Sequence, residues 1–298
     1  MPMRKSWQDR VFNAGNLFYM LLVSACTLYP FLHILAVSLN DARDSTRGGI
    51  TIFPRILSFD SYRTVFGYEG LYHAFFVSVL RTVAGTALFL IVTTLAGYVM
   101  TKTQLKGYRV FYMFFVVSMF VSGGLVPTFL LYKQLGIQNT FWVYILPGAF
   151  STYYMILFRT YIIQLPKGLV ESATIDGAGE FTIFRKIVFP LSTPILATIG
   201  LFVAVNQWNA WQDTLYYTSN PDLETLQYVL MKVLRQAEAT QIAKQARSAM
   251  ARTLGTTTIT PDSIKMAITI VATVPILCVY PFLQKFFVKG MVLGAVKG

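Results

Sequence analysis

Residues 171–194 read E-S-A-T-I-D-G-A-G-E-F-T-I-F-R-K-I-V-F-P-L-S-T-P and form the most polar run between two long apolar segments. The residues around Ala173 place small and apolar side chains at helical spacing. Gly177 follows them, and glycine adopts the left-handed backbone that commonly ends a helix. The sequence therefore predicts a short first helix that ends at Gly177.

A second helix is predicted directly after this glycine. Its apolar stripe, at the spacing of an amphipathic helix, consists of Phe181, Phe184, Ile187 and Val188. Pro190 and Pro194 are expected to stop this helix and to begin the next segment. The whole stretch is interpreted as a helix-turn-helix outside a membrane, with one apolar face available to a partner.

The same residues resemble the cytoplasmic EAA loop of ABC importer permeases, whose pattern is E-A-A-x-x-D-G-A followed by F-x-x-I-x-x-P-x-x-x-P. The matching residues are Glu171, Ala173, Asp176, Gly177, Ala178, Phe184, Ile187, Pro190 and Pro194. Ser172 replaces the first alanine of the pattern, a small residue for a small one. In that family a short coupling helix of this loop docks in a cleft of the ATP-hydrolysing subunit. Periodicity alone also allows an amphipathic linker that rests on the lipid surface.

The composition is that of an integral membrane protein. The 298 residues are 55% hydrophobic and 13% charged, and the mean hydropathy is +0.55. A soluble domain could not expose so much apolar surface. The net charge of +12 comes from basic residues in short loops beside apolar spans, which favours membrane orientation over nucleic-acid binding.

Six transmembrane helices are predicted from the apolar runs, each long enough to cross a hydrocarbon core of ~30 Å. The predicted spans are 17–39, 74–100, 110–132, 141–165, 193–215 and 264–287. The third contains the helix-loosening stretch S-G-G-L-V-P-T at residues 122–128, and Pro147-Gly148 breaks the fourth. The chain is thus predicted to be one all-α membrane domain, 1–298, with a docking loop at 166–194 and an extracytoplasmic insertion at 216–263, of which 223–254 reads as helix.

Basic residues set the expected orientation. Thirteen of the 25 Lys and Arg residues lie in the leader, in the 102–109 loop, beside and within the docking loop and at the C-terminal end, all on one side of a six-span topology. The positive-inside rule makes that side cytoplasmic, together with both termini. Arg81, about two turns inside the second span, is expected to extend outward along its aliphatic stem.

No catalytic or metal-binding motif is present in the sequence. A phosphate loop of the G-x-x-x-x-G-K-[ST] type, a G-x-S-x-G elbow, an H-E-x-x-H motif and Cys/His metal spacings are all absent. The chain is therefore interpreted as non-catalytic, with no metal and no cofactor of its own. The family resemblance implies that ATP and Mg²⁺ bind in a partner ATPase.

The fifth predicted span contains the polar run N-Q-W-N-A-W-Q-D at residues 206–213. In a continuous helix, Asn206, Asn209 and Asp213 would lie within an arc of about 60°. Polar groups in a membrane are expected to mark a solute pathway, and Trp208 and Trp211 offer flat faces for sugar rings. An interhelical hydrogen-bond strip with interfacial tryptophans is the structural alternative. Weaker candidates for the same pathway are Tyr153, Tyr154 and Ser122, for which ordinary packing remains open.

The C-terminal end is similar to that of the maltose-type members of the family, which end in F-x-x-G-x-x-x-G-A-V-K-G. The matching residues are Phe287, Gly290, Gly294, Ala295, Val296, Lys297 and Gly298. In those relatives this tail reaches the interface of the ATPase dimer. The resemblance therefore adds Lys297 and Gly298 to the residues expected to contact the ATPase; a frayed terminus is the alternative.

The resemblance covers essentially the whole chain and is strongest to the carbohydrate-uptake (maltose-type, MalG-like) permeases, within them to the LplB/YtcP-like oligosaccharide group. It implies a type I importer permease in the bacterial cytoplasmic membrane that works with a second, different permease, an ABC ATPase dimer and an extracytoplasmic sugar-binding protein. Uronate-containing substrates such as alginate or pectic rhamnogalacturonan fragments occur in this group. Basic residues of the first outer loop would suit them, or are ordinary solvated charges: Arg43, Arg47, Arg55 and Arg63.

Three other functions remain open from the residues alone. An amino-acid or peptide ABC permease would share the docking loop, and the amides and tryptophans of the fifth span favour sugar over it. An ion-coupled secondary transporter would need buried ionisable groups within its spans, of which Arg81 is the clearest. A membrane-embedded enzyme would need an acid-base pair or a metal constellation that the sequence does not provide.

Overall fold

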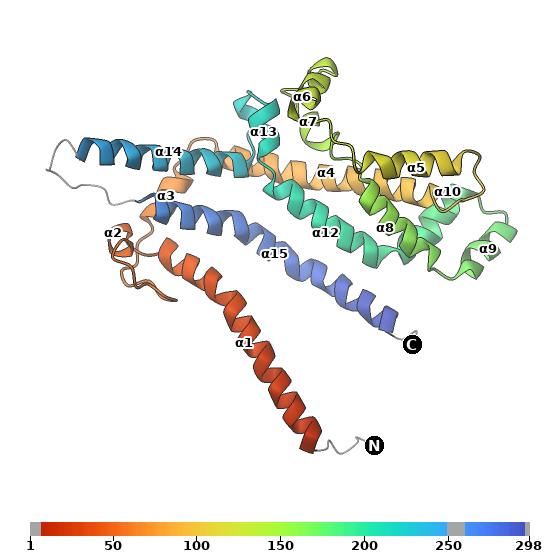
Figure 1. Cartoon of the computed structure of the whole chain (residues 1–298), viewed down its shortest axis with the longest axis horizontal. Helices are drawn as coiled ribbons and strands as arrows, with labels where there is room; N and C mark the ends of the chain where they lie inside the picture. Colours follow the sequence, from red (N-terminus) through yellow and green to blue (C-terminus); the bar gives the residue numbers. More distant parts are fainter. Residues whose placement is uncertain (1–6, 249–259, 296–298) are drawn as a thin grey trace. The chain divides into compact units, whose positions relative to one another are not determined.

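The computed structural model describes residues 7–248 and 260–295, and those ranges are helical, with no β-strand and one isolated antiparallel bridge between Asn40 and Leu57 (Figure 1). The helices in chain order are α1 (Trp7–Ser38), α2 (Ala42–Ser45), α3 (Asp60–Phe66), α4 (Leu71–Val99), α5 (Tyr108–Ser118), α6 (Leu125–Gln134), α7 (Trp142–Ile145), α8 (Thr152–Ile163), α9 (Lys167–Ile175), α10 (Glu180–Ile183), α11 (Phe189–Leu191), α12 (Thr193–Asn209), α13 (Gln212–Tyr217), α14 (Leu226–Ser248) and α15 (Pro261–Ala295). A π-helical turn, Phe184–Val188, joins α10 to α11, and a 3-10 turn, Pro221–Leu223, precedes α14.

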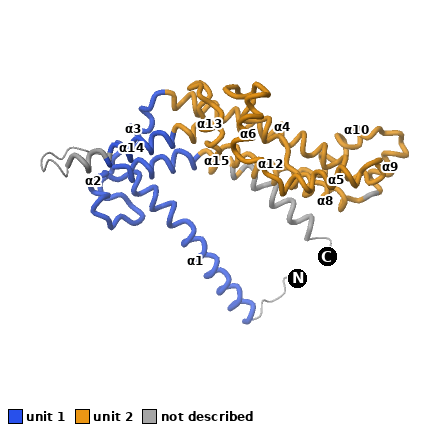
Figure 2. Tube along the Cα trace, turned by 45° about the horizontal axis from the view of Figure 1, so that its top comes forward, with its two compact units in different colours: residues 1–69, 230–274 blue, residues 70–229, 275–298 orange. Residues whose placement is uncertain are grey.

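The chain divides into two compact units. Unit 1 consists of residues 1–69 and 230–274, and unit 2 of residues 70–229 and 275–298 (Figure 2). The docking loop and the polar run of the fifth predicted span both belong to unit 2.

Unit 1 contains the long helix α1 and a folded loop that follows it. The hydroxyls of Ser38 and Tyr62 are 2.8 Å apart, and this hydrogen bond ties the end of α1 to α3. Val65 of α3 is fully buried. Most of α1 is exposed apolar surface, as expected of a helix whose solvent is lipid.

Unit 2 is built around α4, along which both α8 and α12 pack. Its buried core contains Phe89 of α4, Phe158 of α8 and Ile199 of α12. Gly97 allows a close approach of α4 and α8, because a methyl group added there would lie 2.9 Å from the Phe158 ring and 3.1 Å from the Met155 carbonyl oxygen. Small residues at such crossings let helix backbones approach one another in membranes.

Of the six predicted spans, the described residues provide three uninterrupted ones. Three helical stretches are long and apolar enough to cross a membrane: Trp7–Ser38, Leu71–Val99 and Pro261–Val279. A fourth exists if Glu180–Leu191 and Thr193–Asn209 count as one span despite a bend of 78° between them. Within the predicted insertion, the stretch 223–254 predicted as helix contains α14 (Leu226–Ser248), and residues 249–254 lie outside the described ones.

The other predicted spans are interrupted, each for a local reason. The third stops at Ser118 and resumes at Leu125 after Gly124, whose φ of +75° and ψ of 176° suit glycine alone. The fourth is broken between α7 and α8, where Pro147 and Gly148 lie, as the sequence predicts. The fifth was predicted to be continuous, and this is wrong: α12 ends at Asn209 and α13 begins at Gln212.

Candidate functional site

The docking loop, residues 166–194, begins with α9 and turns at Gly177 as the sequence predicts. Gly177 has a φ of +78°, and its N–H donates to the carbonyl of Thr174 at 3.1 Å. The N–H of Ala178 donates to the carbonyl of Ala173 at 2.9 Å. These two bonds form a Schellman motif, which closes the helix end and fixes the direction in which the chain leaves it.

The second helix of the loop ends between Pro190 and Pro194, where the sequence predicts its end. It continues through the π-helical turn and α11 to Leu191, and the chain bends by 78° into α12 around Ser192. A proline inside an α-helix collides with the carbonyl four residues earlier, here that of Lys186. The π turn immediately before Pro190 is wider than an α turn and accommodates the ring.

Most of the apolar face of this second helix packs into unit 2, but Phe181 of the predicted stripe does not. Phe184 and Val188 are buried in the core of unit 2 together with Ile183, which the predicted stripe omitted. Ile187 is half-buried, and Pro190 is exposed. Phe184 thus holds the loop onto the core.

A different set of loop residues is exposed. Glu171, Asp176 and Gly177 are exposed, whereas Ala173 and Ala178 pack against the core. Two large apolar side chains are prominent: Ile175, which the sequence analysis did not select, is 86% exposed, and Phe181 of the predicted stripe is 68% exposed. Their signal in the sequence was an apolar residue on either side of the D-G-A turn. Lys297 and Gly298 lie outside the described residues.

A cavity of about 370 Å³ lies in unit 2 among α4, α7, α12 and α13. Its polar and aromatic lining residues are Arg81, Tyr132, Tyr144, Tyr154, Asn206, Gln207, Asp213 and Tyr217. Phe89 and Val203 supply part of its apolar wall. The cavity therefore offers hydroxyl, amide and carboxylate groups beside aromatic rings.

Arg81 holds the break between α12 and α13. Its Nε donates to Oε1 of Gln207 at 2.9 Å, one Nη donates to the carbonyl of Ala210 at 3.1 Å, and the other pairs with the carboxylate of Asp213. The guanidinium carbon lies 4.7 Å from the ring centroid of Tyr144. The side chain is only 2% exposed, so the expectation that Arg81 extends outward is wrong. The guanidinium instead satisfies a carbonyl at the end of α12 that a broken helix would leave without a donor.

The structure brings three of the predicted pathway residues to the cavity and places five elsewhere. Asn206, Asp213 and Tyr154 line it. Residues away from it are Trp208, Asn209, Trp211, Tyr153 and Ser122.

Local contacts explain three of these placements. Trp208 is buried and lies edge-on to Phe75 at 5.9 Å, beside a separate apolar groove. Asn209, at the end of α12, accepts a hydrogen bond from Gln227 at 3.4 Å. Tyr153 is exposed and packs against the ring of Tyr154 at 5.2 Å.

Several cavity residues were not selected from the sequence, and each had a weak signal. Gln207 lies inside the polar run, and Arg81 was the one clear charge within a span. The tyrosines at 132, 144 and 217 belong to three different helices or helix ends, and only the fold brings them together. Among the described residues, no group of three or more His, Cys, Asp or Glu side chains could hold a metal ion.

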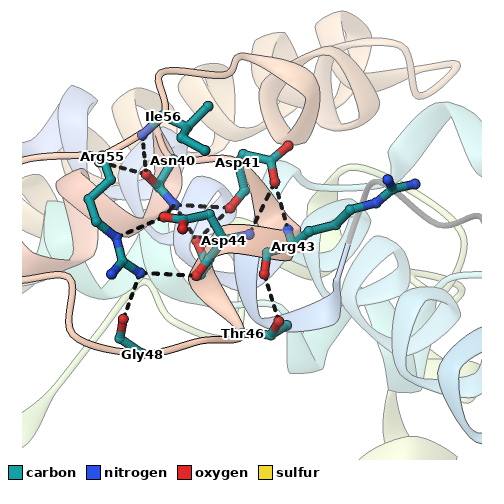
Figure 3. A network of polar contacts seen from close by, with 9 residues as sticks. Asn40, Asp41, Arg43, Asp44, Thr46, Gly48, Arg55 and Ile56 are labelled. Atoms are coloured by element: carbon teal, nitrogen blue, oxygen red, sulfur yellow. Dashed lines mark hydrogen bonds and ion pairs between the residues drawn. The ribbon is translucent and has the colours of Figure 1, made fainter.

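A second polar network, in unit 1, organises the loop after α1 (Figure 3). Oδ1 of Asn40 accepts from the backbone N–H groups of Arg55 at 2.7 Å and Ile56 at 2.9 Å. The Arg55 guanidinium pairs with Asp44 at 2.9 Å and donates to the carbonyl of Gly48 at 2.7 Å. Hydrogen bonding by Asn40, aided by Arg55, holds the pKa of Asp44 below its ordinary value of 3.8. Arg55 is therefore committed to the loop, unlike the more exposed Arg63.

Comparison with known proteins gives matches along nearly the whole chain. Residues 90–293 match the family described as binding-protein-dependent transport system inner membrane component. The chain is 37% identical to Protein LplC of Bacillus subtilis (strain 168), across 99% of this chain and 98% of that protein. It is 34% identical to the polygalacturonan/rhamnogalacturonan transport system permease protein YtcP of the same strain, across 98% and 100% of the two chains.

A solved structure shares the fold. A chain of a bacterial ABC transporter involved in the import of the acidic polysaccharide alginate superimposes with a TM-score of 0.78 at 26% identity. The match covers 95% of this chain and 99% of that one.

Proposed function

The chain belongs to the family of binding-protein-dependent transport system inner membrane components, and we propose that it is a permease subunit of an ATP-driven importer of oligosaccharides. The observation that supports this most strongly is the similarity to YtcP, which extends over nearly the full length of both chains. The name of that relative specifies pectic polysaccharides, and the structural neighbour imports alginate. Acidic, uronate-containing oligosaccharides are therefore the proposed substrate class.

The proposed topology has six spans with both termini in the cytoplasm. The uninterrupted helices supply the first, second and sixth spans, and broken helices supply the third, fourth and fifth. Non-helical backbone at membrane depth is tolerated where protein or a water-filled cavity surrounds it. The breaks in the fourth and fifth spans adjoin the cavity, because Pro147, Gly148 and Ala210 are among its lining residues. Residues 216–263 then lie outside the cytoplasm, and the chain is a multi-pass protein of the bacterial cytoplasmic membrane.

The docking loop is proposed to engage an ABC ATPase. The exposed surface around the Gly177 turn supports this role, since it presents Glu171 and Asp176 beside the apolar side chains Ile175 and Phe181. An exposed apolar residue rimmed by polar ones is typical of an interaction site. Lys297 and Gly298 are proposed as a second contact with the same partner.

The cavity is proposed as part of the solute pathway. Asn206 and Asp213 can hydrogen-bond sugar hydroxyls, and the ring of Tyr154 can pack against a pyranose face. A second, different permease would complete the pathway, and an extracytoplasmic sugar-binding protein would deliver the substrate. Closure of the ATPase dimer on ATP would move the docking loops of both permeases and expose the cavity alternately to the two sides of the membrane.

Affinity purification of the chain from its native membrane, followed by mass spectrometry, tests this proposal. We expect to recover an ABC ATPase, one other permease and a sugar-binding protein. The recovered binding protein can then be titrated with oligogalacturonate and with a neutral arabino-oligosaccharide of equal length, and we expect the acidic sugar to bind more tightly. Recovery of the folded chain without an ATPase would contradict the transport role, whereas preference for the neutral sugar would contradict only the substrate class.

A further inference from the structure

We propose that Glu180 is a positioning residue that joins the docking loop to the end of α4, so that movement of the loop displaces α4 and, through Arg81, the cavity. This inference rests on the proposed docking of the loop to an ATPase. It assigns a role to a carboxylate that lies outside the family pattern matched by the loop. Glu180 is the first residue of α10, which lies at the C-terminal end of α4 (Figure 1).

The Glu180 carboxylate accepts hydrogen bonds from two residues at that end of α4. The hydroxyl of Tyr98 donates to Oε2 at 2.5 Å, and Nζ of Lys102 lies 2.8 Å from Oε1 and 2.7 Å from Oε2. The same ammonium lies 5.1 Å from the centroid of the Tyr98 ring. A single exposed ion pair contributes little, but a carboxylate held by two donors on one element has a defined orientation.

The segment that bears Lys102 is itself fixed to unit 2. The backbone N–H of Lys102 donates to the carbonyl of Val99 at 3.0 Å, which continues the end of α4. Nε of Arg159, on α8, donates to the carbonyl of Met100 at 2.7 Å. The backbone around Lys102 is therefore held by α4 and α8, so Lys102 can fix the position of the Glu180 carboxylate.

The docking loop also makes an apolar contact with α4 that does not involve Glu180. The rings of Tyr98 and Phe184 are 5.2 Å apart, and both residues are buried, as is Val188. Removing the charge of Glu180 therefore leaves the loop packed on the core. A variant at this position should fold and assemble, which separates positioning from stability.

Nearer its N-terminal end, at Arg81, α4 reaches the cavity. Arg81 and Tyr98 are 17 positions apart on one helix without internal proline, which corresponds to about 26 Å at 1.5 Å per residue. Arg81 binds the carbonyl of Ala210 and the carboxylate of Asp213 on either side of the helix break. A rigid helix with fixed contacts at both ends is a physical connection of the kind that coupling between distant sites requires.

The test uses the purified complex in proteoliposomes, with Cys26 and Cys278 replaced by serine and Asn206→Cys as a reporter in the cavity. The rate at which a membrane-impermeant maleimide labels residue 206 is measured with and without ATP and vanadate. We expect ATP to change this rate in the parent protein. In Glu180→Gln and Lys102→Met the ATP-dependent change should fall about fivefold, a typical size for the loss of coupling between sites.

Two further variants distinguish positioning from general damage. The charge-swapped pair Lys102→Glu with Glu180→Lys should restore the response, because the ion pair re-forms with opposite polarity. Lys106→Met, which removes an exposed lysine from the same turn, should leave it unchanged. The amount of ATPase that co-purifies should be equal in all of them.

Each other outcome has a defined meaning. If Glu180→Gln responds to ATP as the parent does, or if the swap fails to restore the response, Glu180 does not transmit movement. If no ATPase co-purifies with the parent protein, the proposed function is wrong, and the proposed role of Glu180, which rests on it, is wrong as well. If the parent recovers the ATPase but the Glu180 variants show the same ATP-dependent change in labelling as the parent, the proposed function stands. Only the inference about Glu180 is then overturned.

Discussion

At the scale of single residues, Arg81 is a buried cation of unit 2. An arginine stays charged in a protein, so burying it requires hydrogen-bond acceptors for the N–H groups of the guanidinium. Gln207, Ala210 and Asp213 provide acceptors, and the ring of Tyr144 covers one face. Arg81 thus satisfies polar groups on both sides of the helix break.

Arg81→Met should destabilise the protein by about 3 kcal/mol, because it leaves the carboxylate of Asp213 and the carbonyl of Ala210 without their donor. Thermal unfolding of the purified complex in detergent measures the change. Arg63→Met is the matched control: its side chain is 82% exposed and its pair with Asp60 spans 3.7 Å. Such a surface pair should contribute less than about 0.5 kcal/mol. Equal stability of the two variants would show that the Arg81 contacts contribute nothing.

Asp44 should make the loop after α1 sensitive to acid. Its pKa is lowered in the folded protein, mainly by the hydrogen bond from Asn40, so its contribution is fully present above the ordinary value of 3.8 and is lost as the pH falls through the folded pKa. Hydrogen-exchange protection of the Arg55 and Ile56 amides, corrected for intrinsic rates, should decrease below pH 3.8. In Asp44→Asn this decrease should be absent, and its persistence there would assign the effect to another group.

At the scale of elements, the docking loop shows what a sequence pattern can and cannot locate. The end of α9 at Gly177 could be predicted, because a positive φ is a property of one residue and its neighbours. The buried face of the second helix could not. Periodicity indicates which residues share a face, but the choice between Phe181 and Ile183 depends on the end of α4 and on the core packed against them.

Gly177→Val should disrupt the loop, whereas Gly179→Val should not. Neither position has an atom within 4 Å of an added methyl group, so the two substitutions differ only in backbone conformation. Gly177 has a φ of +78°, and Gly179 lies in the extended region with a φ of −70° and a ψ of 157° that valine favours. A left-handed valine costs at least about 1–2 kcal/mol. Such a cost should reduce the ATPase retained by the purified complex about 5–30-fold, and equal retention by the two variants would contradict the requirement for this turn.

At the scale of the whole molecule, the family, the helical class and the apolar segments could be predicted from sequence. Each of them follows from the composition or from a local motif. The continuity of the fifth span could not be predicted. No proline or glycine lies between Asn206 and Asp213, and the break there depends on Arg81, more than 120 positions earlier in the chain. Nor could the cavity lining be predicted, because its tyrosines at 132, 144 and 217 come from three separate segments, while Asn209 bonds to Gln227 instead.

The pairing of Arg81 with Asp213 also restricts the order in which the two residues can be replaced during evolution. Loss of Asp213 first would leave a buried guanidinium that cannot be neutralised, whereas loss of Arg81 first would leave a carboxylate that can take up a proton. The side chain of Asp213 is also 36% exposed, against 2% for Arg81, so the surviving acid would be partly hydrated. Proteins of this lineage that lack both residues should therefore have lost the arginine first and the aspartate second.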